Sequence, residues 1–215
     1  MLSKTNKKTY TVRLGFDKKH LHKFGGNSWT IINKKDMDIN PHLLFVFDLN
    51  DTIFDYLNIT KLSELPICSY INSDAWVEEQ VYKIDKKSHT IQVISASNPT
   101  GFILPDEDKY PNPFAEKLIS IEALESNTCQ KDIDCFLGGS SFVRLLDEPL
   151  WIQEAKTIRC QTCNKEMKHV LDIGYENWAD ERGLLTDEPF FIGEGALYFF
   201  YCDSCQELKV VSQSA

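Results

Sequence analysis

Two CxxC pairs, Cys160-x2-Cys163 and Cys202-x2-Cys205, constrain the fold of this 215-residue chain more than any other feature. A tetrahedral zinc site needs four ligands from two short turns, and a CxxC turn can present two sulfurs at the spacing that Zn–S bonds of roughly 2.3 Å require. Asn164 follows the first pair, and asparagine tolerates the left-handed backbone conformation that turns the chain back. The spacing predicts one structural Zn²⁺ ion per chain, with the ligands Cys160, Cys163, Cys202 and Cys205.

Other roles for the four cysteines remain as alternatives. A thioredoxin-like redox pair would lie at the start of a helix, whereas strand-like sequence flanks both pairs. An iron–sulfur cluster also takes four thiolates, but not usually at this spacing, and four unrelated buried cysteines are the remaining case. Catalytic zinc keeps an open position, which four thiolates close, so we expect a structural metal. His169 is a possible competing ligand.

Most segments have the pattern of β-strands. Short apolar runs at residues 42–49 and 196–202 are typical of strands buried on both faces. Residues 80–85 and 89–96 predict a hairpin, and so does the sequence on either side of the second CxxC turn. Residues 112–126 place apolar side chains near helical spacing after Pro113, which predicts a helix. The predicted class is α+β, mostly antiparallel β.

Two glycine pairs divide the chain into similar parts. Gly25-Gly26 and Gly138-Gly139 each precede an apolar β-type segment that runs into an acid, and such pairs suit positive φ or close backbone approach. We therefore predict two related halves, residues 20–112 and 113–215, after a basic N-terminal arm at residues 1–19. The second half would carry a zinc-ribbon-like pair of hairpins with the four cysteines.

The charge distribution favours a basic partner. The net charge is −9, but residues 1–23 contribute +6, which leaves −15 for the remainder. An acidic body makes nucleic acid an unfavourable partner, because little positive charge is available to displace counterions. An acidic region near residues 172–194 is either a solvated face or a surface that attracts a basic protein. Its proposed contact residues are Glu176, Asp180, Glu181, Asp187, Glu188 and Glu194.

The composition is that of a globular protein, with 42% hydrophobic and 26% charged residues. We expect no secretory signal, because the N-terminal residues lack an apolar segment, and no run approaches the 18 apolar residues of a membrane span. The expected location is the cytoplasm, where a reducing environment favours metal binding by paired cysteines over disulfides.

No familiar catalytic motif is present: the chain has no GxSxG, P-loop, GxGxxG or HExxH. An enzyme would have to assemble its site from scattered residues, and the best candidates are His20, His22, Asp48 and Asp51. The alternative for the two acids is a strand end that caps a following helical turn. Cys68 is expected to be a small buried apolar residue, and Cys129 and Cys135 have no histidine close in sequence to act as a base.

Two families share a pattern with this sequence. The segments "FLGGSSF", "LW", "CQTCNKEM", "VLDIGY" and "GEGALYFFYCDSCQELKVVSQ" resemble the core of the programmed cell death protein 2 family. The segments "KFGGNSW", "LLFVFDLND" and "LPICSYINSDAW" are similar to bacterial YwqG-like proteins. The chain departs from the first pattern where Ser141-Phe142 stands in the place of a Pro–Trp element.

The resemblance implies that the four cysteines are the zinc ligands and that Gly138 and Gly139 form a turn. It also implies a binding protein more than an enzyme: the first family escorts a ribosomal protein, and some YwqG-like proteins are candidate immunity proteins. The expected function is a non-enzymatic, zinc-stabilised module that neutralises an interbacterial toxin by direct binding. The alternatives are a chaperone for a basic ribosomal protein and an enzyme of unknown chemistry.

Overall fold

The computed structural model describes residues 9–15, 17, 19–35, 37–73, 79–96, 104–124, 136–139, 141–145, 148–176, 183–185, 189–190 and 192–214. These residues form one sheet of twelve strands in the order β3-β7-β6-β12-β11-β10-β9-β1-β8-β2-β4-β5. Neighbouring strands are antiparallel except β3 and β7, which are parallel. The strands are β1 (Tyr10–Leu14), β2 (His22–Phe24), β3 (Thr30–Ile32), β4 (His42–Asp48), β5 (Glu64–Ser69), β6 (Glu79–Asp85), β7 (Thr90–Ala96), β8 (Lys117–Ala123), β9 (Val143–Leu145), β10 (Lys168–Ile173), β11 (Gly195–Cys202) and β12 (Glu207–Ser214).

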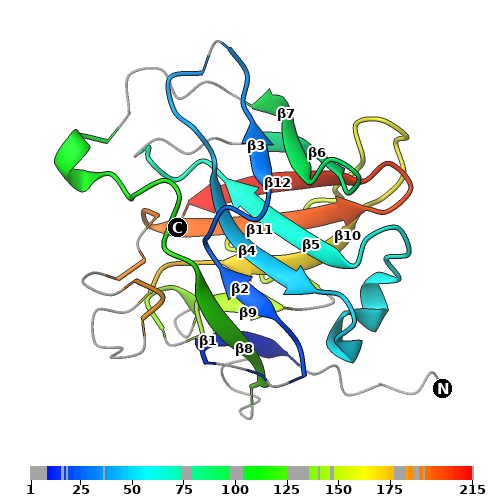
Figure 1. The fold of residues 1–215 in the computed structure, drawn as a ribbon, viewed down its shortest axis with the longest axis horizontal. Helices are drawn as coiled ribbons and strands as arrows, with labels where there is room; N and C mark the ends of the chain where they lie inside the picture. The colour runs from blue at the N-terminus through cyan, green and yellow to red at the C-terminus, as the bar shows by residue number, and fades with distance from the viewer. Residues whose placement is uncertain are drawn as a thin grey trace.

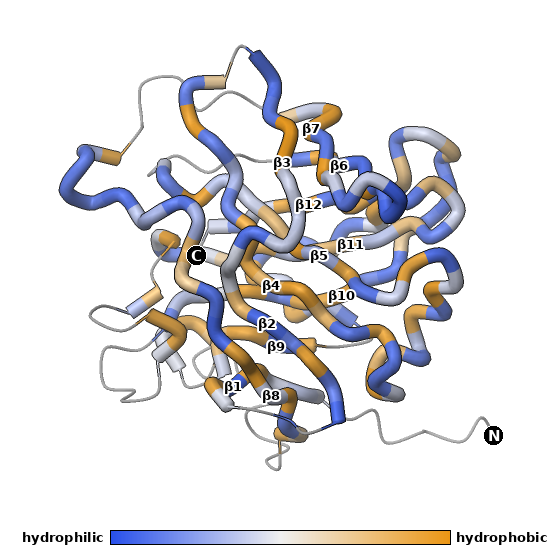
Figure 2. The backbone as a smooth tube through the Cα atoms, viewed as in Figure 1, coloured by the Kyte–Doolittle hydropathy of each residue, from blue (hydrophilic) through white to orange (hydrophobic). Residues whose placement is uncertain are grey.

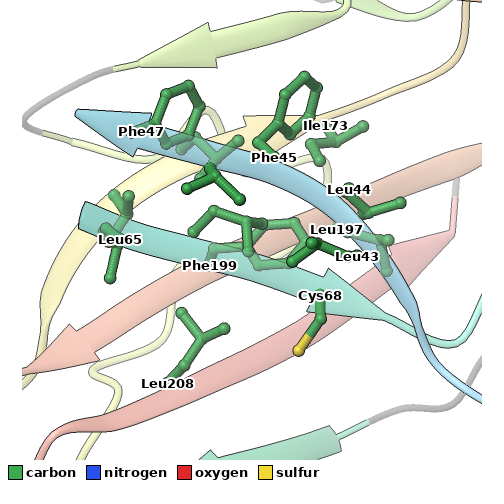
Figure 3. Close-up of a cluster of buried hydrophobic side chains, with 14 of the residues drawn as sticks. Leu43, Leu44, Phe45, Phe47, Leu65, Cys68, Ile173, Leu197, Phe199 and Leu208 are labelled. Atoms are coloured by element: carbon green, nitrogen blue, oxygen red, sulfur yellow. The ribbon is translucent and has the colours of Figure 1, made fainter. Parts of the chain in front are cut away.

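The long sheet folds over itself, so that β4 and β5 cross in front of β10 and β11 (Figure 1). The two layers enclose the main hydrophobic core. In the close-up, Phe45 and Leu65 lie on the β4–β5 layer, while Phe199 and Leu208 belong to the layer behind it (Figure 3). These four side chains are at most 1% exposed. Hydrophobic residues are concentrated along the central strands, and many of the loops around them consist of hydrophilic residues (Figure 2).

The sequence of β11 is apolar throughout because both faces of this strand are buried. Leu197, Phe199 and Tyr201 belong to the main core between the two layers. The alternate residues Tyr198 and Phe200 pack on the other side, in a second and smaller core. Since successive side chains of a strand point to opposite faces, this division explains why β11 shows no polar alternation. The prediction of a strand buried on both faces is confirmed.

The second core exists because residues 148–167, the covering segment, lie over the outer face of β10–β12. Its Trp151 ring packs on the Tyr198 ring with a centroid distance of 4.5 Å. The Tyr198 hydroxyl donates to the backbone of Leu150 (2.9 Å) and accepts from the backbone N–H of Ile152 (3.0 Å). Further along, the Gln153 N–H donates to Oε1 of Gln213 (2.9 Å). Polar anchors thus fix the covering segment to the sheet on both sides of its aromatic contact.

The predicted helix at residues 112–126 is wrong, because residues 117–123 form β8 between β1 and β2. Ile119 is 1% exposed and its neighbour Leu118 is 39% exposed, which is the alternation of a strand. Backbone pairing on both sides outweighs the helical spacing of the apolar residues. Among the described residues, the two named helices are short 3-10 turns, η1 (Thr52–Leu57) and η2 (Asp106–Asp108).

The predicted division into an arm and two halves also needs correction. Residues 10–14 of the expected arm form β1, which pairs with β8 and β9 inside the sheet. Strands from residues 20–112 and 113–215 interleave: β8 pairs with β2, and β6 pairs with β12. The boundary at residues 112 and 113 therefore does not separate two sheets.

Other local predictions are confirmed. The two hairpins form as β6–β7 and β11–β12. Gly25, Gly26 and Gly138 have φ angles of +67°, +81° and +75°, as the glycine pairs suggested. A Cβ on Gly25 would lie 2.7 Å from the Cβ of Phe114, so this turn also requires close approach. In the part of the chain that the structure describes, no helix is long and apolar enough to span a membrane.

Candidate metal centre

The four cysteines come from two turns of similar shape. Cys160 and Cys163 lie in a turn of the covering segment, where the Asn164 N–H donates to the Cys160 carbonyl (2.9 Å). Cys202 ends β11, and Cys205 lies in the turn that leads into β12. The residue after each pair is left-handed, with φ of 58° at Asn164 and 51° at Gln206. The prediction for Asn164 is confirmed, and the same conformation recurs at Gln206.

The sulfur atoms converge at metal-binding distance. All four Sγ atoms lie within 4.8 Å of one another, and Cys163 Sγ is 3.7 Å from Cys202 Sγ. A tetrahedral ion with Zn–S bonds of roughly 2.3 Å separates its ligands by about 3.8 Å. Cys160 and Cys202 are buried, while Cys163 and Cys205 are half-buried. The four thiols therefore form a group that could hold one metal ion close to the protein surface.

Backbone hydrogen bonding prepares one of the thiols for metal binding. The Lys165 N–H lowers the pKa of the Cys163 thiol to about 7, because it stabilises the thiolate. Burial raises the pKa of Cys160 and of Cys205. Thiolates bind a divalent cation, so an ion at this position would hold the buried sulfurs in their charged form.

Glu207 joins the two turns, and its role is not apparent from the sequence pattern alone. Its side chain is 2% exposed, directly after the second turn. One carboxylate oxygen accepts from the Gln161 N–H (2.6 Å), and the other accepts from the Thr162 hydroxyl (2.7 Å). Gln161 and Thr162 are the two residues between the first pair of cysteines. The carboxylate therefore fixes the first turn against the start of β12.

The second turn is fixed to a different part of the fold. The Asp203 carboxylate accepts from the Thr60 hydroxyl (3.0 Å) and from the Thr60 N–H (3.2 Å). Lys61 donates from its ammonium group to the carbonyl of Ser204 (2.7 Å), and Lys83 donates to the carbonyl of Cys205. The cluster is therefore integrated with the loop between η1 and β5 and with β6, and it does not stand apart as a separate small domain.

His169 is not part of the cysteine cluster. Its Nε2 lies 2.6 Å from Asp172 Oδ1, and both side chains are buried. The second Asp172 oxygen accepts from the Leu150 N–H of the covering segment (2.9 Å). Asp172 stands directly opposite Arg144 on β9, and Arg144 is completely buried. A buried polar group thus lies beneath the covering segment, beside the metal centre.

The residues of the enzyme alternative meet in space. His22 Nδ1 accepts from the Asp48 N–H (3.1 Å), so its Nε2 carries the proton and donates to Asp51 Oδ2 (3.1 Å). His20 Nδ1 lies 3.7 Å from Asp48 Oδ2. Asp51 also caps η1, where its Oδ1 accepts from the Ile53 N–H, as the capping alternative predicted. Both nitrogens of His22 therefore bind the protein itself, and burial lowers its pKa.

The acidic region differs from a uniform exposed face. Glu176 is 3% exposed, and its carboxylate accepts from the N–H groups of Leu184 (2.9 Å) and Phe190 (2.8 Å). Glu176 therefore organises a loop and does not belong to an exposed partner surface, which corrects the prediction. Glu194 is exposed. The remaining predicted contact residues lie outside the described residues: Asp180, Glu181, Asp187 and Glu188.

Of the other cysteines, Cys68 is completely buried on β5, as expected, and burial raises its pKa. Cys129 and Cys135 lie outside the described residues. Comparisons with protein-family models, with curated proteins and with solved structures found no match to this chain.

Proposed function

We propose that this chain is a non-enzymatic protein-binding module with one structural zinc ion, and that it is an immunity protein which neutralises a cognate interbacterial toxin by direct binding. The four-cysteine cluster carries the proposal. Its sulfurs lie within 4.8 Å of one another, and four thiolates complete a tetrahedral zinc shell. Such a shell leaves no position for a substrate, so the ion stabilises the fold.

The position of the cluster supports a structural role. One pair of cysteines lies in the covering segment and the other at the β11–β12 turn, so an ion would join the covering segment to the sheet. Structural zinc contributes on the order of 10 kcal/mol, which is comparable to the stability of a whole domain. Zinc in a reducing cytoplasm can fix this segment where a disulfide would not persist.

The charge supports a basic partner. The chain carries −9 overall and −15 outside residues 1–23, so it attracts a positively charged protein over a distance of about one Debye length. Charge complementarity of this kind speeds association and disfavours acidic partners. The resemblance of the cysteine turns and of residues 193–213 to the programmed cell death protein 2 family, stated above from the sequence, agrees with this proposal.

Affinity capture tests the function. The tagged chain is isolated from cells of its own source, and the proteins bound to it are identified by mass spectrometry. One basic toxin domain in stoichiometric amount is the expected result. A ribosomal protein instead would replace immunity by a chaperone role, and absence of any stoichiometric partner would contradict the proposal. A Cys163→Ser variant serves as the control for capture by misfolded protein.

A further inference from the structure

A cavity of about 540 Å³ lies between η1, the covering segment and the outer face of β10–β11. This volume is within the range of sites for small ligands or for a single inserted side chain. Its lining includes the aromatic residues Tyr56, Trp151 and Phe200 and the polar residues Glu148, Glu166 and His169. The metal centre adjoins it, because Ile158 and Met167 line the cavity and pack with Cys160 in the second core.

One wall of the cavity is a pair of stacked aromatic rings. Trp151 and Phe200 lie with their centroids 5.8 Å apart and their planes 18° from parallel. Trp151 is half-buried, and its ring also packs on the Tyr198 ring. The face of an indole ring attracts a cation, and the planar guanidinium group of arginine can also stack on it.

Two glutamates and two lysines line the same cavity. Glu148 and Glu166 both line it and are both exposed. Lys168 also lines the cavity, and its ammonium group keeps its positive charge while it donates to the carbonyl of Leu57 (2.6 Å). Lys156 is the second lysine of the lining and is exposed. An arginine can bind a carboxylate with two parallel hydrogen bonds while it stacks on the aromatic wall, which a lysine cannot do.

A buried polar network holds the floor of the cavity in place. His169, which lines the cavity, contacts the Asp172 carboxylate at 2.6 Å, and Asp172 accepts from the Leu150 N–H of the covering segment. Burying such polar groups costs free energy unless they are hydrogen-bonded, and here the bonds to Asp172 join β10 to the covering segment. A wall fixed in this way loses little conformational entropy when a ligand binds.

We propose that this cavity binds an arginine side chain of the basic partner, with the guanidinium group stacked on Trp151 and paired with Glu148 or Glu166. The assignment rests on the proposed function for the identity of the partner, but the binding chemistry is testable without that partner. The covering segment supplies Trp151, Glu148 and Glu166, so the four-cysteine cluster also fixes the binding residues in position.

The test uses the full metal-loaded chain and two small probes of the same shape, which differ in charge and in one group that is a donor in one and an acceptor in the other. Nα-acetyl-arginine amide is titrated against ¹⁵N-labelled protein while the indole N–H signal of Trp151 is followed by NMR. Nα-acetyl-citrulline amide, which is neutral and of the same shape, is the matched probe. The expected result is saturable binding of the arginine probe with Kd on the order of 1 mM and at least tenfold weaker binding of citrulline.

Two mild variants locate the site. Glu148→Gln and Glu166→Gln remove negative charge from exposed positions, and at least one of them should weaken arginine binding several-fold. Glu107→Gln, an exposed substitution outside the cavity lining, should leave it unchanged. Equal affinity for both probes, no shift of Trp151 up to roughly 50 mM arginine probe, or no effect of either variant would overturn the assignment.

The outcomes separate this inference from the proposed function. Capture of a basic partner together with equal binding of both probes would refute the arginine site and retain the function. Selective binding of the arginine probe without any captured partner would support the site and contradict the function.

Discussion

Replacement of Glu207 by alanine tests how strongly the two cysteine turns depend on their protein contacts. The carboxylate is 2% exposed and accepts from the Gln161 N–H at 2.6 Å and from the Thr162 hydroxyl at 2.7 Å. Both donors lie between Cys160 and Cys163. The substitution removes both acceptors and leaves the first turn without its anchor on β12.

The expected loss follows from these two hydrogen bonds. A bond to an ionised acceptor contributes about 1.5–3 kcal/mol, so Glu207→Ala should lower the free energy of unfolding by about 3–6 kcal/mol. For a chain of this size each kcal/mol changes Tm by about 2–4 °C, which predicts a decrease of about 6–24 °C. Glu207→Gln keeps one acceptor, and the Thr162 hydroxyl can reverse to accept from the amide, so its loss should be about 1–2 kcal/mol.

Thermal unfolding followed by circular dichroism measures both variants, with Glu194→Gln as the control at an exposed position. Metal content is determined on the same samples, because the variants keep all four cysteines. A Tm within about 2 °C of the wild type for Glu207→Ala would refute the reasoning, since it would mean that the carboxylate does not hold the turn.

Three further changes follow from the structure. Cys163→Ser should abolish metal binding and unfold at least the covering segment, whereas Cys68→Ala should keep the metal; equal metal content in the two proteins, measured by mass spectrometry, would contradict this. Phe199→Ala should cost about 3–5 kcal/mol in chemical denaturation, and Leu21→Ala, at a side chain 57% exposed, less than about 0.5 kcal/mol. Burial lowers the pKa of His42 to about 4, so the unfolded chain binds the extra proton first as the pH falls. The free energy of unfolding should therefore decrease as the pH falls from 6.5 to 4, and His42→Gln should make this decrease smaller. An equal decrease in the variant would mean that other groups cause it.

Much of the local structure follows from the sequence because it depends on short-range patterns. The CxxC spacing and Asn164 predict the first cysteine turn, and the apolar run of β11 predicts a strand buried on both faces. The buried Cys68 and the Asp51 cap are equally local features. In each case the residue type and its near neighbours determine the outcome.

The predictions that failed concern features that depend on contacts between distant parts of the chain. Residues 117–123 carry apolar side chains at helical spacing, yet pairing with β1 and β2 makes them a strand. Residues 10–14 look like part of a basic arm, and only their partners β8 and β9 place them inside the sheet. Neither partner lies near in sequence.

The candidate site shows the same limit. In the sequence, Glu176 is one acid among many. In the structure it is buried, and its carboxylate accepts from the backbone N–H groups of residues 184 and 190. The anchoring role of Glu207 and the cavity lined by Trp151 depend on how the covering segment lies over β10–β12. A capping acid or a turn leaves a signal in sequence, whereas a contact across layers does not.

The most direct test of the account is the metal content of the wild-type chain, purified without added metal. Inductively coupled plasma mass spectrometry measures the metal, and a separate assay measures acid-labile sulfide in the same sample. The account predicts one zinc per chain, lost together with the folded covering segment on strong chelation. Less than about 0.1 zinc per chain in folded protein, or iron with sulfide in its place, would contradict it.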